Sequence, residues 1–313
     1  MRPNRRSATP LLVVALLAAQ AGCHRGAGGA SFLSLFGLSE KPVVVALVAK
    51  PGVLDPFAPH EKLRQAMSET IKRPVRLDLC FPIQLEPNLK LGFYDFALVT
   101  PACYVEMNDR ERFDILAAAV DETGCVAHSA VLVVAAGSKI NDVADLRGKK
   151  VAFGPRDNAR TYHAGLVLLR EHGLDKRDLS LSLLPVPGSL RHFSNMRQIA
   201  QAVQSGDFDA GFIDEVAFEQ FERSPAVEGE PDRDKLRVLA RTMPVPGVLV
   251  IQSPKAKPEI VRKVADFLLS AGETHPQALR PLLLSAYQKP TAKLCAWSEL
   301  PAKPRAPTPD EEE

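Results

Sequence analysis

The sequence predicts an α/β protein of two lobes that are joined by two extended crossings. Short apolar runs alternate with amphipathic segments along most of the 313 residues, a pattern typical of strands and helices around parallel sheets. Extended stretches at 130–134 and 243–247 divide the chain. We therefore expect lobe 1 to comprise residues 43–134 and 245–290, and lobe 2 to comprise residues 135–244.

The first lobe begins with a strand–helix–strand pattern. Apolar runs at 43–49 and 75–81 predict two buried strands. Their β-α-β order predicts a parallel pair with a right-handed crossover. Between them, residues 60–71 predict a helix whose apolar side chains recur every four positions, namely Leu63, Met67 and Ile71.

Three further apolar runs in lobe 1 predict strands at 94–99, 113–120 and 130–134. Thr100 and Pro101 follow the first of these runs and suit the N-cap and first turn of a helix. This turn would lie at the carboxyl end of its strand, where ligands bind in open parallel sheets.

The second lobe is expected to open with a helical turn at 140–146 and a buried strand at 151–153. Gly154 and Pro155 break this strand, and the helix that follows would end at Gly173 in a left-handed C′ position. Unpaired N–H groups at the start of this helix would favour an anion. An ordinary connection without a ligand is the alternative.

Later segments complete the alternating pattern. Prolines and four final acidic residues at 300–313 predict a disordered tail. The remaining expected elements are strands at 179–186, 208–213, 236–240 and 247–251, helices at 195–204, 214–221, 258–269 and 277–286, and a polar loop at 224–234.

The first 22 residues have the features of an export signal. Three arginines precede an apolar run at 11–19, which is shorter than a membrane span requires. Ala-Gly-Cys at 21–23 resembles a bacterial lipobox, with Gln20 in place of the usual leucine. We expect a diacylated Cys23, a flexible tether at 23–42, and a membrane-anchored protein in the periplasm or at the cell surface. Ordinary signal cleavage with release into the periplasm is the alternative.

The charge balance does not suggest a nucleic-acid-binding protein. The formal net charge is +2, and without the three arginines of the signal it is −1, from 36 basic and 37 acidic residues. Charged residues make up 24% and hydrophobic residues 46% of the chain, which is ordinary for a globular protein. A basic surface field is therefore not expected.

The cysteines and histidines do not have the spacing of a metal site, so we expect neither a metal nor a cofactor. In an oxidising compartment the four cysteines after Cys23 permit two disulfides with three connectivities. Cys80 alternatively suits a buried free thiol. The four are Cys80, Cys103, Cys125 and Cys295.

Five segments between residues 43 and 284 carry motifs in a characteristic order and spacing. They are a Pro-x-x-Tyr turn within 95–104, Asp-Leu-Arg-Gly-Lys-Lys-Val-Ala-Phe-Gly at 145–154, a Gly-Ser-x-x-His loop at 188–192, Gly-Asp-Phe-Asp-Ala-Gly at 206–211, and Met-Pro-Val-Pro-Gly at 243–247. Together these segments resemble the phosphate-, phosphite- and phosphonate-binding proteins of ABC transporters.

The resemblance implies two Rossmann-like lobes of the type II periplasmic-binding-protein fold, which close on a ligand like a flytrap. It implies an extracytoplasmic solute-binding protein, and not an enzyme, that captures a small oxyanion such as phosphonate, phosphite or phosphate between the lobes. With the lipid expected on Cys23, this protein would be a lipoprotein. An ABC permease and its ATPase would be its partners. We expect the protein to be a monomer.

The resemblance also implies which residues contact the ligand. Tyr104 matches the tyrosine of the Pro-x-x-Tyr turn, His192 stands nearest to the loop histidine, and Asp214 follows the strand entered at 206–211. The other expected contacts lie in polar loops at strand ends and are Thr100, Asn158, Arg160, Thr161 and Ser189.

One departure from the family falls at the helix start of lobe 2. Where the family has a Ser-Thr-Ser cradle for the oxyanion, this chain has Asn158, Ala159 and Arg160. The guanidinium of Arg160 suits bidentate contact with an oxyanion. The alternatives are a solvated Arg160, an Asn158 that only caps the helix, and a Tyr104 that packs beneath its turn.

Two other functions remain open. A protein of the same fold would serve as a receptor that signals ligand occupancy to a membrane sensor. A thiaminase-like enzyme of related fold would use Cys103 as its nucleophile, although no base is evidently paired with that thiol.

Overall fold

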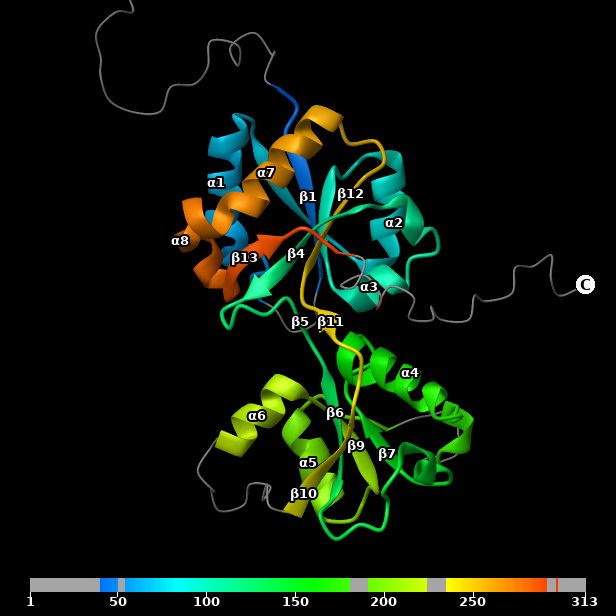
Figure 1. The fold of residues 1–313 in the computed structure, drawn as a ribbon. Coiled ribbons are helices and arrows are strands. Elements are labelled where there is room, and N and C mark those ends of the chain that lie inside the picture. Colours follow the sequence, from blue (N-terminus) through cyan, green and yellow to red (C-terminus); the bar gives the residue numbers. More distant parts are fainter. Residues whose placement is uncertain (1–39, 50–53, 181–190, 224–234, 292–296, 298–313) are drawn as a thin grey trace, which may run out of the picture. The chain divides into compact units, whose positions relative to one another are not determined.

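The computed structural model contains two α/β lobes, each built around its own sheet (Figure 1). It describes residues 40–49, 54–180, 191–223, 235–291 and 297. No helix in these ranges is long and apolar enough to cross a membrane. The predicted features that fall outside them are the signal segment, Cys23, the tether up to residue 39, residues 181–190 with Ser189, the loop at 224–234, Cys295 and the tail at 300–313.

Lobe 1 is built on a six-stranded sheet with the strand order β13-β4-β12-β3-β1-β2. β1 (Val43–Val48) pairs in parallel with β2 (Val75–Cys80) and with β3 (Phe96–Val99). α1 (Glu61–Ile71) connects β1 to β2 and buries Leu63, Met67 and Ile71. The predicted strand–helix–strand unit is therefore confirmed.

The other half of this sheet is antiparallel. β12 (Leu249–Gln252) lies between β3 and β4 (Ile115–Asp121), and β13 (Leu284–Gln288) pairs with the outer edge of β4. Because β12 and β13 come after lobe 2 in the chain, two separate stretches of sequence make up the sheet of lobe 1.

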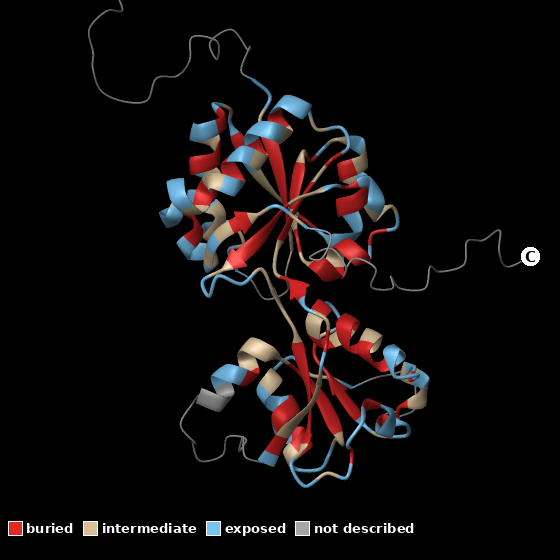
Figure 2. Cartoon of the chain, viewed as in Figure 1, coloured by how far each residue is buried: buried red, intermediate tan, exposed pale blue. Residues whose placement is uncertain are grey.

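Helices cover both faces of the lobe 1 sheet (Figure 1). α1, α7 (Pro258–Thr274) and α8 (Pro276–Leu279) pack on one face. α2 (Pro82–Leu91) and α3 (Pro101–Val105) pack on the other. The strands between these two layers are largely buried (Figure 2).

The sequence pattern did not reveal α2, because its apolar face is short and Pro87 stands inside it. Gly92 ends this helix in the left-handed conformation, with a φ of 77°. The buried carboxylate of Glu86 accepts hydrogen bonds from Lys90 and from two backbone amides of the loop after α3. These bonds satisfy a buried charge and tie α2 to α3.

The helix predicted at 277–286 is wrong. α8 ends at Leu279, a 3-10 turn follows, and Leu283 adopts a left-handed φ of 56° before β13 begins. Pro281 offers no backbone N–H to continue a helix, whereas the outer edge of β4 offers backbone partners for a strand. Tertiary pairing thus decides the conformation of this segment.

Lobe 2 is built on a five-stranded sheet with the strand order β10-β6-β9-β7-β8. α4 (Ala164–Glu171) packs on one face, and α5 (Met196–Gln204) and α6 (Glu215–Arg223) pack on the other (Figure 1). Gly173 follows α4 with a φ of 71°, which confirms the predicted C′ glycine. The strands are β6 (Ala130–Ala135), β7 (Val151–Phe153), β8 (Arg191–His192), β9 (Ala210–Asp214) and β10 (Leu236–Arg241).

Two short strands join the lobes. β5 (Ala127–His128) and β11 (Val245–Pro246) form an antiparallel pair. β6 follows β5 directly and pairs with β9 and β10, so it lies in the lobe 2 sheet and not in lobe 1, where its residues were expected. An apolar run alone does not reveal which sheet it joins.

Trp297 packs into lobe 1 beyond the end of β13. Its side chain is 1% exposed and belongs to the apolar cluster on the α2 and α3 face. The indole ring meets the ring of Tyr104 edge-on, with the centroids 5.7 Å apart. A large buried area of this kind fixes the chain at residue 297 against lobe 1.

Three cysteines within the described residues, Cys80, Cys103 and Cys125, are free thiols. The disulfides that sequence reasoning allowed are therefore not formed among these three. Cys80 is buried, and burial raises the pKa of its thiol. The alternative of a buried free thiol is confirmed for Cys80.

A short polar contact supports the first crossing. Nε2 of His128, in β5, lies 2.5 Å from Oδ2 of Asp121, at the end of β4. Burial alone would raise the pKa of Asp121, but hydrogen bonds from Thr123, His128 and a backbone amide outweigh it and lower the pKa to about 2.

The Asp121→Asn variant tests this contact. A carboxylate whose pKa falls on folding stabilises the protein above its ordinary pKa of 3.8 and loses that contribution as the pH drops toward 2. We expect the free energy of unfolding of the variant to lie below that of the wild type at pH 7. The difference should shrink below about pH 4, as measured by urea unfolding across a pH series. A difference in unfolding free energy that stays constant down to pH 2.5 would contradict this expectation. The control is Glu122→Gln, at an exposed neighbouring position.

Candidate ligand-binding site

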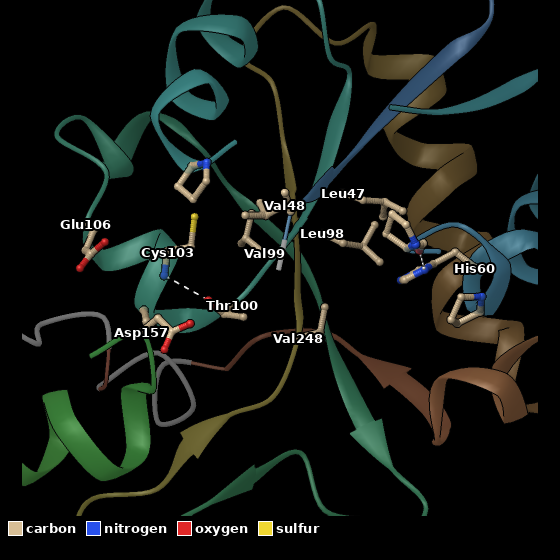
Figure 3. Close-up of a pocket in the computed structure, with 15 residues that line it drawn as sticks. Leu47, Val48, His60, Leu98, Val99, Thr100, Cys103, Glu106, Asp157 and Val248 are labelled. Carbon is tan, nitrogen blue, oxygen red and sulfur yellow. Dashed lines mark hydrogen bonds between the residues drawn. The ribbon is translucent and has the colours of Figure 1, made fainter. Parts of the chain in front are cut away.

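A cavity of about 300 Å³ opens at the carboxyl ends of β1 and β3 (Figure 3). This is the edge at which open parallel sheets bind ligands. Its walls come from the ends of β1 and β3, the segment before α1, the starts of α2 and α3, and the loop that leads into α4. The lining residues are Leu47, Val48, Ala49, Pro56, Pro59, His60, Pro82, Leu98, Val99, Thr100, Ala102, Cys103, Glu106, Asp157 and Val248.

The walls of this cavity are mainly hydrocarbon, and its charged groups are acidic. Glu106 comes from just after α3 and Asp157 from the loop before the helix start of lobe 2. Figure 3 places both carboxylates on one side of the cavity and His60 on the opposite side. Within the described residues, neither lysine nor arginine lines it.

Thr100 is positioned as the sequence predicted. Its Oγ1 accepts a hydrogen bond of 3.2 Å from the amide of Cys103, which confirms Thr100 as the N-cap of α3. Thr100 also lines the cavity, so a ligand in the cavity would meet this cap. The ligand contact itself stays a prediction.

Tyr104 is placed differently from Thr100, although it belongs to the helix that Thr100 caps. The side chain is 7% exposed and does not line the cavity. Its hydroxyl lies 3.1 Å from the carbonyl oxygen of Arg110 and 3.3 Å from that of Phe113. The structure therefore favours the alternative in which Tyr104 packs beneath its turn.

Asn158 begins the helical segment of lobe 2. Its Oδ1 accepts hydrogen bonds from the amides of Arg160 and Thr161, at 3.0 and 3.1 Å. The expectation that these helix-start amides are unpaired is wrong, because the side chain of Asn158 caps them. The structure confirms that Asn158 caps this helix start, and its contact with a ligand stays a prediction. The first turn, η5 (Ala159–His163), is a π-helical turn of the kind often found at functional sites.

Arg160 and Asp214 form an ion pair. Nη1 of Arg160 donates to Oδ2 of Asp214 at 2.9 Å, and the two side chains are only 22% and 17% exposed. Nε of Arg160 also donates to the carbonyl oxygen of Val245, in β11, at 3.4 Å. Two expected ligand contacts are thus joined to each other and to the second crossing.

Thr161 is fully buried and does not line the cavity. A Cβ placed on Gly154 would come within 2.0 Å of its Oγ1, so the two residues are in close contact. Thr161 Oγ1 has no hydrogen-bond partner among the described residues. The predicted ligand contact of this hydroxyl would require it to leave its buried position.

His192 lies at the end of β8, beside β7. Its Nδ1 is 2.7 Å from the carbonyl oxygen of Gly154, so Nδ1 carries the proton in this bond. Burial lowers the pKa of His192, and the charge of Arg156 lowers it further, although the bond to Gly154 opposes them. The imidazole is therefore neutral, and its bond ties β8 to the residue that follows β7.

Cys103 lines the cavity but is a poor nucleophile. Burial raises the pKa of its thiol to about 12, and the charge of Glu106 acts in the same direction. Nucleophilic cysteines need the opposite shift, toward the thiolate. Within the described residues no cluster of histidine, cysteine and carboxylate side chains has the arrangement of a metal site.

A family model described as the periplasmic substrate-binding protein of a phosphonate ABC transporter matches residues 58–294. The chain belongs to this family. It is accordingly a periplasmic substrate-binding protein of an ABC transporter, of the phosphonate type, and its family is a class of transport proteins and not of enzymes.

Solved structures share the fold of this binding protein. A Xanthomonas citri protein bound to ATP is 18% identical, with a TM-score of 0.63 over 82% of this chain and 94% of that one. PhnD1 from Prochlorococcus marinus, in complex with methylphosphonate, is 15% identical, with a TM-score of 0.55 over 82% and 96%. The binding component of a Pseudomonas aeruginosa phosphonate transporter is 18% identical, with a TM-score of 0.53 over 82% and 84%. The predicted type II periplasmic-binding-protein fold is confirmed.

A double-mutant cycle tests the Arg160–Asp214 pair. Removing one partner leaves the other partly buried and unpaired, so Arg160→Ala and Asp214→Asn should each lower the free energy of unfolding by about 1–3 kcal/mol. The double variant should lose about 1 kcal/mol less than the sum of the two single-variant losses, as measured by urea unfolding.

The matched control is Arg241 with Glu215, a pair of the same 2.9 Å length in lobe 2 whose arginine is 62% exposed. Its coupling energy should be smaller, because solvent screens exposed pairs. Equal coupling energies in the two pairs would show that Arg160 and Asp214 attract each other no more strongly than an exposed pair does.

Proposed function

We propose that this binding protein is an extracytoplasmic lipoprotein that captures a solute with a small oxyanion group, such as phosphonate, phosphite or phosphate, and delivers it to an ABC permease. Its membership in the phosphonate-type family supports the transport role. The choice of an oxyanion as the ligand rests instead on the contacts of this chain's own residues.

The observation that carries this proposal is the position of Arg160. Its guanidinium has five N–H donors, and within the described residues it meets two acceptors, one from Asp214 and one from Val245. The remaining donors suit an oxyanion, whose paired oxygens match the planar fork of arginine. Arg160 would then replace the hydroxyl cradle that Asn158 and Ala159 do not supply.

The carboxylate of Asp214 sets a limit on the charge of the oxyanion. It lies 2.9 Å from the guanidinium and would repel a second negative charge brought to the same place. A singly charged oxyanion, or one whose solute also carries an amine, should therefore bind better than a dianion. Because Arg160 also bonds to the second crossing, a ligand here would favour one arrangement of the lobes by its differential affinity.

A ligand panel tests the proposal. Thermal unfolding with phosphate, phosphite, methylphosphonate and 2-aminoethylphosphonate should show a rise in melting temperature for at least one of them, because binding only to the folded state adds RT ln(1 + [L]/Kd) to stability. The Arg160→Ala variant should lose at least tenfold in affinity by calorimetry, the cost of one charge-assisted hydrogen bond.

Arg241→Ala is the matched control for this loss, because Arg241 lies in lobe 2 and pairs with Glu215. Full affinity in the Arg160→Ala variant would remove Arg160 from the ligand site. An absence of any response to the four ligands would contradict oxyanion capture as a whole.

The lipid anchor is proposed from the Ala-Gly-Cys sequence at 21–23. A diacylated Cys23 would hold the protein at the membrane by two acyl chains, which suffices for stable anchoring. The residues up to 39 would then separate the anchor from β1.

Labelling of bacterial cells with radioactive palmitate tests the anchor. The wild-type protein should carry the label and sediment with membranes, whereas Cys23→Ala should lose the label and appear in the soluble periplasmic fraction. Cys125→Ala, at an exposed free thiol, is the control and should keep the label. A soluble, unlabelled wild-type protein would favour ordinary signal cleavage.

A further inference from the structure

The edge of the lobe 1 sheet at which β1, β2 and β3 begin carries basic and apolar side chains that solute binding does not use. It consists of the loops at 72–74, 92–95 and 253–257, which together form the amino-edge surface. We propose that the amino-edge surface rests on the anionic surface of a phospholipid bilayer. The inference rests on the proposed lipid anchor for the nearness of a membrane, and it adds a second contact with that membrane.

Backbone hydrogen bonds hold the three loops together around the start of β1. The amide of Val43 donates to the carbonyl oxygen of Pro74 at 2.8 Å. The amide of Asp95 donates to the carbonyl oxygen of Val44, and the amide of Ser253 donates to that of Asp95, both at 2.9 Å. The loops therefore form one continuous surface at the end of lobe 1 where the chain enters β1 and where β12 leads into α7 (Figure 1).

The amino-edge surface is basic. Its loops contain one acidic residue, Asp95, whose Oδ2 accepts a hydrogen bond of 2.9 Å from a backbone amide of β1. Beside the loops, Glu259 in the first turn of α7 is paired with Lys263 at 2.9 Å, so this pair adds no net charge. The basic residues of the loops are Lys72, Arg73, Lys255 and Lys257, and the three lysines are exposed. Such a surface attracts anionic headgroups.

Exposed apolar side chains accompany these charges. Phe93 is 63% exposed, and Leu91, at the end of α2, is 58% exposed. A Cβ placed on Gly92 would lie 3.2 Å from Cβ of Lys255, so the lysine packs directly beside the backbone that leads into Phe93. Aromatic and basic side chains occur together where proteins enter the interface between headgroups and acyl chains. A dissolved anion would meet only the lysines, whereas a bilayer offers a partner to the ring as well.

The point at which the chain enters lobe 1 favours a membrane as the partner. The sequence predicts a lipid on Cys23 and a tether up to residue 42, and β1 begins with Val43 at the amino-edge surface. A flexible chain of this length spans roughly 25 Å on average. The anchor would therefore hold the amino-edge surface near the bilayer at a high effective concentration, at which a weak contact suffices. The cavity lies at the opposite ends of β1 and β3 and would stay open to solutes.

Sedimentation with vesicles tests the inference on the mature chain from residue 23 without its lipid. The protein should bind vesicles of equal parts phosphatidylglycerol and phosphatidylcholine, should bind far less to phosphatidylcholine alone, and should dissociate at high salt. The Lys72→Gln, Lys255→Gln, Lys257→Gln triple variant should lower the partition coefficient at least tenfold. Each basic residue near an anionic surface contributes about fivefold, so the loss of three exceeds this limit.

A second triple variant removes the same charge from other positions and is the matched control. Lys62→Gln, Lys139→Gln, Lys150→Gln changes three exposed lysines that lie outside the amino-edge surface. Its partition coefficient should stay within about twofold of the wild-type value, because only charges close to the bilayer contribute. Thermal unfolding of both triple variants establishes that they are folded before their partition coefficients are compared.

The Phe93→Trp variant tests the apolar contact by fluorescence. Trp297 is the only tryptophan of the chain and is 1% exposed, so it gives a constant background. The emission of the indole at position 93 should shift to shorter wavelength when anionic vesicles are added, because the ring leaves water for the interface. The matched control is Phe81→Trp, at a phenylalanine that is 61% exposed and follows β2 at the opposite edge of the sheet, and its emission should not shift.

The outcomes separate the inference from the proposed function. Equal sedimentation with anionic and neutral vesicles, or equal partition coefficients of the two triple variants, would overturn the inference. A fluorescence shift at position 81 and not at position 93 would also overturn it. Since these measurements use protein without lipid, palmitate labelling decides the anchor separately. A labelled protein whose unlipidated form ignores vesicles would keep the anchor and lose the amino-edge contact, and an unlabelled protein that binds vesicles would do the reverse.

Discussion

The ion pair between Arg160 and Asp214 is the contact on which the candidate site depends. It joins the helix start after β7 to the end of β9, 54 residues away, and Arg160 extends the contact to Val245, 85 residues away in the second crossing. Because the chain itself supplies the counter-charge, the site does not offer an uncompensated cation to every anion. A solute must share the guanidinium with Asp214 or displace it, and either process favours a ligand with additional contacts.

The other polar groups at the helix start are likewise capped or buried within the protein. Asn158 already occupies the amides that would otherwise hold an anion, and Thr161 is buried against Gly154. The usual sources of anion affinity at a helix start are thus used within the protein. An oxyanion at this helix start would therefore depend mainly on the guanidinium of Arg160.

Local sequence signals predicted the elements that local physics determines. The apolar run of β1, the Thr100 cap of α3 and the left-handed Gly173 each follow from a few adjacent residues. β13 was mistaken for a helix, because its conformation depends on pairing with β4, which lies more than 160 residues earlier in the chain. The inward direction of Tyr104 and the Arg160–Asp214 pair likewise depend on tertiary contacts, which no short motif contains. The family motif therefore located the loops of the site more reliably than the direction of each side chain.

A crystal structure of the full mature protein with methylphosphonate is the most direct test of whether Arg160 holds the oxyanion. The phosphonate oxygens are expected within hydrogen-bond distance of the Arg160 guanidinium, which has donors left beside its bonds to Asp214 and Val245. A phosphonate bound elsewhere, with the Arg160–Asp214 pair unchanged, would contradict this assignment of the site.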